Sequence, residues 1–393
     1  MSNTIELRAI KGVRNDIPLE RFDKTDLDAG NNIDIDETGK VFRRMGTNRL
    51  TAGSMHSLKS FVSNSLVVNS NMLSSVNAAG AVTSLGAQVV GRLSYTEIAS
   101  EIFWSDGINN GIVGAGANRQ WGVPVPALPS VTVSGGDLRA GTYLYTSVYV
   151  RSNGLESGAP VCGSITVGPN SALVFSGLSP SADPLVTRTR IYISSVSGEL
   201  PYVAADVSST LSSVVVAALP VGALQIRTLL KSPPPAGQLL GYYNGRAYVG
   251  SGRFLWYSEP YEYELFGMDN FLAFPSVLKT FAPVSTGVYL GTETETMYLD
   301  GADPSEFVRK SVAPYGTVLG TEFYVRNDLL LDGKQFGSTP VWMSKTGLCL
   351  GLDGGEMQNL TSDRFILPPG LSEGASLLKI RSGTPQLVTT IFA

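Results

Sequence analysis

The sequence predicts an all-β protein: a β-propeller of about six blades, interrupted by an inserted immunoglobulin- or fibronectin-III-like β-sandwich. Three observations lead to this prediction. Helical periodicity is nearly absent, and short apolar runs alternate with Gly, Asn, Asp and Ser. Similar hairpin patterns recur along the chain, and 43 Gly and 22 Pro among 393 residues are typical of a folded protein with many turns.

Five segments share one pattern, in which three apolar residues are followed by a small or polar residue and a short turn. They begin at Leu66, Ile102, Ala247, Val288 and Val341, so the intervals are 36, 145, 41 and 53 residues. Three of these intervals lie near the roughly 40–50 residues of a propeller blade. The clearest returning strands are 254–257, 296–299 and 348–350. Each unit is therefore predicted to be a β-hairpin within one blade.

The interval of 145 residues predicts one blade plus an insertion of roughly 100 residues. The insertion lies between the Pro-rich stretch 124–129 and the Pro triplet 233–235, and it is rich in Ser, Thr and Val. Its seven strand-like runs are at 130–134, 141–151, 161–167, 172–176, 188–194, 202–207 and 212–217. Seven short strands in such a length are typical of an immunoglobulin-like sandwich. The alternative is a set of long propeller loops.

The propeller is thus expected in two parts, residues 1–128 and 233–393, with the fibronectin-III-like sandwich at 129–232. A sixth hairpin is expected near the N-terminus, with strands at 33–36 and 40–45. The final run, 386–392, is expected to close the ring against the first blade. The best helix candidates are short: the turn at 261–265 and the segment 94–100.

The inventory of side chains argues against an enzyme. His56 is the only histidine, whereas catalytic triads and most zinc sites need imidazole. The Asp-Gly pairs at 106–107, 332–333 and 353–354 are predicted to be turns. The sequence contains no Walker loop, EF-hand loop or Cys/His metal spacing. We therefore expect no catalytic residue, no cofactor and no metal ion.

Charge and hydropathy exclude further classes of protein. Charged residues make up only 16% of the chain, against about 25% in ordinary soluble domains. A net charge of −4 gives no strong attraction to phosphate, which argues against a sequence-reading nucleic-acid binder. No signal peptide and no membrane-spanning segment are expected, so synthesis in a cytoplasm is expected. Cys162 and Cys349 are expected to be buried thiols in different domains.

Two groups of residues are candidates for contacts with partners. Arg43 and Arg44 are adjacent in a predicted strand, so only one of them can face DNA in a channel; the alternative is pairing with acidic loops. The second group is aromatic and comprises Trp256, Tyr257, Tyr261 and Tyr263. These four residues are candidates for contact with a partner or a sugar, and packing between blades is the favoured alternative.

Two stretches of the chain resemble a known family. The first covers residues 12–16 and 29–46, with the sequences GVRND and AGNNIDIDETGKVFRRMG. The second begins with LWYSEP at 255–260, continues with FPS at 274–276 and ends with the run 287–304, which closes on GADP. Both resemble propeller proteins from the tails of short-tailed bacteriophages, called tail nozzle, tail-hub or packaged-DNA-stabilising proteins. The resemblance covers both ends of the chain and skips the insertion.

This resemblance implies a structural protein of the virion tail that is made in the host cytoplasm. It implies a homo-oligomeric, hexameric ring below the portal and its adaptor protein, with attachment surfaces for a tail fibre or spike. Such a ring retains packaged double-stranded DNA and conducts it during ejection through non-specific contacts. A weakly charged lumen agrees with sliding DNA, because each neutralised phosphate adds affinity. The alternative function is a glycan-binding or glycan-cleaving propeller with a fibronectin-like module; an intracellular scaffold is a third.

Overall fold

The computed structural model describes residues 9–36, 38–46, 48–62, 65–219, 222–330, 337–381 and 384–392. Over these residues the chain is all-β, as predicted: strands β1 to β35 are accompanied by one short helix, α1 (Asn327–Leu330), and two 3-10 turns. The strands form many small, open sheets, which are antiparallel apart from the short pair β1–β2. Among the described residues, no helix is long and apolar enough to cross a membrane.

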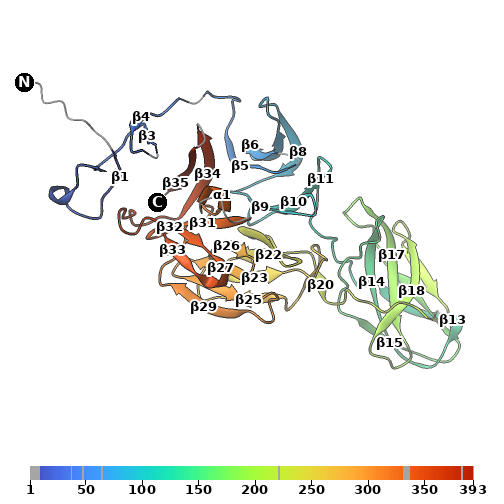
Figure 1. Ribbon diagram of the computed structural model, residues 1–393. Helices are drawn as coiled ribbons and strands as arrows, with labels where there is room; N and C mark the ends of the chain where they lie inside the picture. Colours follow the sequence, from blue (N-terminus) through green and yellow to red (C-terminus); the bar gives the residue numbers. More distant parts are fainter. Residues whose placement is uncertain are drawn as a thin grey trace, which may run out of the picture.

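Five four-stranded antiparallel sheets follow one another along the chain (Figure 1). The first comprises β5 (Met55–Ser60), β6 (Ser65–Asn69), β7 (Met72–Val76) and β8 (Val82–Gln88). The second comprises β9 (Ser94–Ile98), β10 (Glu101–Ser105), β11 (Asn110–Gly114) and β12 (Ala117–Arg119). The third comprises β21 (Leu239–Tyr243), β22 (Arg246–Ser251), β23 (Phe254–Tyr257) and β25 (Phe271–Ala273). The fourth comprises β26 (Leu278–Val284), β27 (Gly287–Thr292), β28 (Thr296–Asp300) and β29 (Val308–Ala313), and the fifth β30 (Phe323–Arg326), β31 (Ser338–Ser344), β32 (Gly347–Gly351) and β33 (Met357–Asn359).

The five recurring apolar runs all fall on the second strand of a sheet, which explains why they stand out in the sequence. They lie in β6, β10, β22, β27 and β31. The second strand has a hydrogen-bonded neighbour on each side and a packed layer on each face, so its side chains are apolar without alternation. All six residues of β27, for example, are buried. The returning runs form β23, β28 and β32, as predicted.

Successive sheets stack face to face, and we call the five sheets together the sheet stack. Residues that alternate along a strand pack toward opposite neighbours. In β10, Ile102 and Trp104 pack toward the first sheet, whereas Phe103 packs toward the third. In β27, Leu290 packs toward the third sheet and Tyr289 toward the fifth. Each layer of the core therefore lies between two sheets.

Two described segments lie outside the five sheets of the stack, one before the first sheet and one after the fifth. β34 (Glu373–Arg381) and β35 (Thr384–Phe392) form a hairpin, and Leu387 packs on the fifth sheet. The expectation that 386–392 closes the ring against the first sheet is wrong for the described residues, because β35 takes its hydrogen bonds from β34. The N-terminal hairpin forms as predicted, from β3 (Ile33–Ile35) and β4 (Val41–Arg43). It lies on an arm, residues 9–46, that extends from the stack and also carries β1 (Gly12–Val13), the 3-10 turn Leu19–Arg21 and β2 (Asp26–Leu27) (Figure 1).

Neither short helix candidate is helical. Residues 94–98 form β9, and Ala99 and Ser100 turn the chain into β10 with φ angles of 51° and 69°. Hairpin turns of this kind usually carry Asn or Gly, so the sequence lacks the usual turn signal here. The segment 261–265 is an irregular turn that leads into β24 (Phe266–Gly267), which pairs with β20 (Lys231–Ser232).

The insertion between β12 and β20 contains seven strands, one at each predicted run. A three-stranded sheet has the order β13 (Ser130–Leu138), β16 (Ser171–Ser176) and β19 (Ser213–Val216). A four-stranded sheet has the order β15 (Gly163–Val167), β14 (Gly141–Arg151), β17 (Val186–Ser194) and β18 (Pro201–Ser208). Apolar residues of both sheets, including Tyr143 and Phe175, share one core. We call this part, which stands apart from the sheet stack in Figure 1, the inserted unit.

The two cysteines are free thiols, one in each part of the chain. Cys349 is buried in the layer between the fourth and fifth sheets, as predicted. Cys162 is only half-buried, so the expectation of a buried thiol is wrong there. The reason is its place directly before β15, an edge strand of the inserted unit.

Candidate functional site

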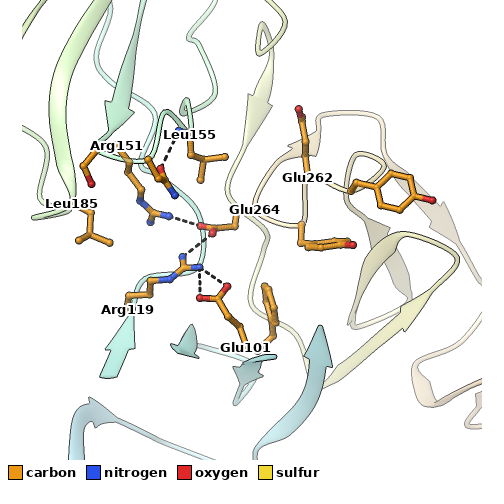
Figure 2. Close-up of a pocket in the computed structure, with 12 residues that line it drawn as sticks. Glu101, Arg119, Arg151, Leu155, Leu185, Glu262 and Glu264 are labelled. Carbon is orange, nitrogen blue, oxygen red and sulfur yellow. Dashed lines mark hydrogen bonds and ion pairs between the residues drawn. The ribbon is translucent and has the colours of Figure 1, made fainter. Parts of the chain in front are cut away.

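A cavity of about 370 Å³ lies where the inserted unit meets the second and third sheets (Figure 2). Four charged side chains of its wall come from different elements. Glu101 begins β10, Arg119 ends β12, Arg151 ends β14, and Glu264 lies in the loop between β23 and β24. The remaining wall comprises Phe103, Ser152, Asn153, Leu155, Leu185, Tyr261, Glu262 and Tyr263.

The four charges form a continuous chain of ion pairs, which Figure 2 shows as dashed lines. Arg151 Nη1 and Arg119 Nη1 each lie 2.7 Å from an oxygen of Glu264. Arg119 Nη2 lies 2.8 Å from Glu101 Oε2. The backbone N–H of Gly122 also donates to Glu264, at 3.0 Å. The Glu264 carboxylate thus binds Arg151 of the inserted unit, Arg119 of the second sheet and the backbone N–H of Gly122, which follows β12.

Arg151 is the most deeply buried member of this chain, with 2% of its side chain exposed. Its Nε lies 2.7 Å from Asp183 Oδ2, and Asp183 is 4% exposed. A buried charge is tolerated only when it is paired and hydrogen-bonded, because desolvation costs several kcal/mol per ion. Asp183 pairs with Arg151 within the inserted unit, and Glu264 supplies the second carboxylate from outside it.

The charged side chains of the cavity link the inserted unit to the sheet stack. Burial lowers the pKa of Arg119, but attraction to Glu264 and Glu101 outweighs burial, so the pKa is raised overall. The carboxylate of Glu264 is shared by both arginines, whereas that of Glu101 pairs with Arg119. Glu262 lines the cavity and is exposed. The arrangement holds two parts of the chain in one orientation and leaves an acidic, aromatic rim accessible to solvent.

Two of the four predicted aromatic residues lie in packed layers. Trp256 and Tyr257 are adjacent on β23 and therefore face opposite sides of the third sheet. Trp256 packs against the layer between the second and third sheets, and its ring also lies 4.9 Å from that of Phe271 in the same sheet. Tyr257 packs against the layer shared with the fourth sheet, and the Arg246 guanidinium lies 5.4 Å from its ring. Packing between sheets accounts for these two residues.

The other two aromatic residues line the cavity. Tyr261 is 76% exposed, and its backbone has a φ angle of 59°, which is rare for residues other than glycine. Its N–H donates to the carbonyl of Gly245, at 2.7 Å. The ring of Tyr263 makes edge contacts with Phe103 and Tyr242. Burial and the neighbouring Tyr242 raise the pKa of Tyr263.

The predicted DNA-contact residues lie in and directly after β4 on the N-terminal arm, which Figure 1 shows on the opposite side of the sheet stack from the inserted unit. Arg44 Nε lies 3.0 Å from Asp34 Oδ1, and 52% of the Arg44 side chain is exposed against 5% of Asp34. Arg43 is exposed on β4. The alternative of pairing with an acidic residue therefore holds for Arg44, and Arg43 remains accessible.

Sequence reasoning missed the ion-pair chain. Arg151 lies 113 residues before Glu264, and Arg119 lies 145 residues before it. No local pattern marks such pairs, because single charged residues at strand ends are common. The weak signal was the position of Arg151 at the end of a long apolar strand, where a charge must find a partner or reach solvent.

Comparisons with known proteins name no family. No family model matches the chain, and no curated protein matches it. Among solved structures, the AfRom2 CNH domain aligns with 83% of this chain and 92% of its own, at 10% identity and a TM-score of 0.24. Two structures described as extracellular domains of a hybrid two-component and a one-component system from B. thetaiotaomicron give TM-scores of 0.24 and 0.23 at 9% identity. They align with 84% and 91% of this chain but 57% and 61% of their own lengths, and at these scores none carries an argument about fold or function. Among the described residues, no group of His, Cys, Asp or Glu could hold a metal ion.

Proposed function

We propose that the chain is a structural subunit of the tail of a short-tailed bacteriophage, a nozzle or hub. The observation that carries the proposal is the N-terminal arm. Among its described residues, Ile10 alone has a buried apolar side chain, whereas Leu19 and Met45 are 59% and 66% exposed. The arm is tied to the rest of the chain where Asn15 and Asp26 bind residues 364–366, so its exposed apolar side chains are available to a neighbouring subunit. The first stretch that resembles the phage family, 29–46, lies on this arm.

The same proposal includes the architecture. The five stacked sheets would be five blades of a propeller, and the hairpin β34–β35, in place of the predicted N-terminal hairpin, would be the sixth. The inserted unit would be a sandwich of the immunoglobulin or fibronectin III type. The meander order of each four-stranded sheet and the apolar layers between sheets support the first part. Seven strands in two sheets with a shared core support the second. The domains would then be residues 1–128 and 233–393 for the propeller and 129–232 for the sandwich.

As a tail subunit, the protein would reside in the virion after synthesis in the host cytoplasm. It would form a homo-oligomeric ring, expected to be hexameric, and bind an adaptor protein and a tail fibre or spike. Double-stranded DNA would contact the ring without sequence preference, and the exposed Arg43 is the better of the two candidate contacts. No catalytic role, cofactor or metal ion is part of this proposal.

Native mass spectrometry of the purified full-length protein tests the assembly, together with electron microscopy of virions. We expect a closed ring and labelling at the tail. A matched pair of variants sharpens the test: Met45→Asp on the arm should reduce ring formation, whereas Val215→Asp on the exposed side of the inserted unit should not. A strict monomer that is absent from virions would refute the proposal.

A glycan-binding propeller remains the second candidate because of one observation, the exposed ring of Tyr261 beside Glu262 and Asn153 in the cavity. Sugars bind to aromatic faces that are flanked by polar groups. A glycan array and a hydrolysis assay on wild type, Tyr261→Ala and Tyr261→Phe decide the matter. Binding that Tyr261→Phe keeps and Tyr261→Ala loses would support this function, and no binding to any glycan would exclude it.

A further inference from the structure

The hairpin β34–β35 has half the strands of the other sheets. Each sheet of the sheet stack has four strands, whereas β34 and β35 pair only with each other among the described strands. β35 is the second strand of its sheet, and its run 386–392 has the apolar sequence QLVTTIF. Second strands of the stack have a hydrogen-bonded neighbour on each side, but β35 has one, and its Phe392 is 57% exposed. Two further strands would complete this sheet.

Hydrogen bonds of β34 show which backbone groups of β35 face the open edge. In an antiparallel pair, opposite residues alternate between exchanging hydrogen bonds and directing their N–H and C=O groups away from each other. Gly374 lies opposite Ile391, and its N–H donates to the Leu319 carbonyl at 2.8 Å, away from β35. The backbone groups of Ile391 therefore face the open edge, and by alternation so do those of Thr389 and Leu387.

The open edge of β35 lacks the usual protection of an edge strand. Proteins protect such edges with charged residues, prolines, bulges or a covering segment, because an open edge pairs readily with another chain. The run 386–392 has no charged residue and no proline, and its pairing with β34 has no register shift. Among the described residues, no partner binds the outward backbone groups of Leu387, Thr389 and Ile391. A two-stranded hairpin alone is only marginally stable, so we expect another strand to cover β35.

The N-terminal arm carries a second open hairpin, which has the two strands that β34–β35 lacks. β3 and β4 pair only with each other among the described strands. The N–H of Asp36 donates to the Lys40 carbonyl at 3.1 Å, so this pair is hydrogen-bonded. By the same alternation, the next pair, Ile35 and Val41, directs its backbone groups to the outer edges of the hairpin. Both side chains are apolar and half-buried, so the hairpin matches β35 in backbone geometry and in chemistry.

The hairpin of the same chain is held away from β35. The N–H of Ile10 donates to the Gly39 carbonyl at the hairpin tip, at 3.0 Å. The base of the arm binds residues 364–366 through Asn15 and Asp26. One chain therefore presents an open edge on β35 and an open hairpin on the arm at two separate places. Two different complementary surfaces on one subunit produce head-to-tail contacts between copies.

We propose that the β3–β4 hairpin of a second copy of this chain adds to the open edge of β35 and completes a four-stranded sheet across the subunit boundary. Backbone hydrogen bonds to Leu387, Thr389 and Ile391 hold the added strand, as in other cases of strand addition to a sheet edge. The inference rests on the self-assembly that is part of the proposed tail function, and it names the two surfaces that meet. Because these surfaces differ, the contact closes into a ring or continues as a filament.

Cross-linking of mixed full-length subunits tests the pairing. In a Cys162→Ser background, one subunit carries Ile35→Cys on the hairpin and the other carries Thr390→Cys on β35, and a short bismaleimide joins thiols that come close. We expect a covalent dimer with one chain of each kind in the mixture and loss of this product when either subunit is treated alone. Equal dimer from Thr390→Cys alone would show that β35 pairs with β35 and would overturn the proposal.

The double variant, with both cysteines in one chain, separates the remaining outcomes. A product that stays within one chain would mean that the hairpin completes the sheet of its own subunit, which overturns the proposal. If native mass spectrometry shows a ring but no cross-link forms, the proposed pairing fails while the tail function stands. If the protein is a monomer without any cross-link, both fail.

A proline on the open edge provides an independent test. Thr389→Pro removes an N–H that faces away from β34, so the hairpin keeps its own ladder but loses a donor to the added strand. Thr389→Ala is the matched control, because it removes the same hydroxyl and keeps the N–H. We expect Thr389→Pro to lose the assembled species in native mass spectrometry and Thr389→Ala to keep it, with circular dichroism confirming that both are folded. Equal assembly of the two folded variants would contradict the proposed edge.

Discussion

Replacing Glu264 with glutamine should loosen the inserted unit from the sheet stack. The substitution keeps the size of the side chain and removes the charge that Arg119 and Arg151 share. Removing one partner from a buried ion pair costs about 3–5 kcal/mol, because the other charge remains buried. Arg151 keeps its pair with Asp183, so we expect the lower end, a loss of about 3 kcal/mol.

The chain offers probes that separate its two parts. Trp104, Trp256 and Trp342 lie in the sheet stack, and Trp121 lies at the junction, where its Nε1 donates to the Tyr263 carbonyl and its ring packs against Phe103. Tryptophan fluorescence therefore reports the sheet stack and the junction but not the core of the inserted unit. Circular dichroism reports both parts. In urea, Glu264→Gln should lower the midpoint seen by circular dichroism and separate it from the fluorescence midpoint. Small-angle scattering should show a broader distribution of sizes.

Glu262→Gln is the matched control for this prediction. Glu262 lines the same cavity, is exposed and has no ion pair with any residue that the structure describes. Its substitution should change the free energy of unfolding by less than about 0.5 kcal/mol. If both variants behave alike, the ion-pair chain does not hold the inserted unit, and the reasoning fails.

Three further predictions test the packing. Gly241→Ala would place a Cβ 2.1 Å from an aromatic ring of the fourth sheet and should destabilise the stack by about 1–3 kcal/mol in urea; a neutral result would refute the close approach. Trp256→Ala should lose about 3 kcal/mol whereas Tyr261→Ala should stay within about 0.5 kcal/mol, and the reverse order would contradict their assigned environments. Burial raises the pKa of both thiols, but Cys162 is half-exposed, so Ellman's reagent should modify Cys162 in the native protein and Cys349 only after unfolding. Equal reaction rates would show that the layer around Cys349 opens readily.

The strands were predictable because their signals are local. The run predicted from Ala247 to Gly250 is apolar and lies between turns, and it falls within β22. The long strand predicted at 141–151 alternates Ser and Thr with apolar residues, and it has the bounds of β14. The strand at 94–98 was instead predicted to be a short helix. Tyr95 and Ile98 have helical spacing, and the turn that follows them lacks Asn or Gly. The order of neighbouring sheets followed from the repeat, since each sheet is complete before the next begins.

The charged contacts could not be predicted in the same way. Glu264 acquires its partners only when the insertion folds back against the loop after β23. Arg92 reaches the Gly320 carbonyl only when the chain leading into the fifth sheet returns beside the loop between the first and second sheets. Both depend on the three-dimensional path of the whole chain. The four aromatic residues look alike in the sequence but occupy two different environments. Trp256 and Tyr257 lie on a strand and face opposite sides of its sheet. Tyr261 and Tyr263 lie in the turn that follows, where they line the cavity.

The two ends of the inserted unit meet at the sheet stack. A Cβ on Gly122, before the unit, would lie only 2.8 Å from the Cβ of Pro233, after it. The inserted unit can therefore be removed as a whole, because a peptide of few residues can bridge the gap between Gly122 and Pro233. Over evolutionary time, such a site can accept, lose or exchange whole modules while the strand order around it stays the same, and in the laboratory it offers a position for grafting a reporter or a binding domain.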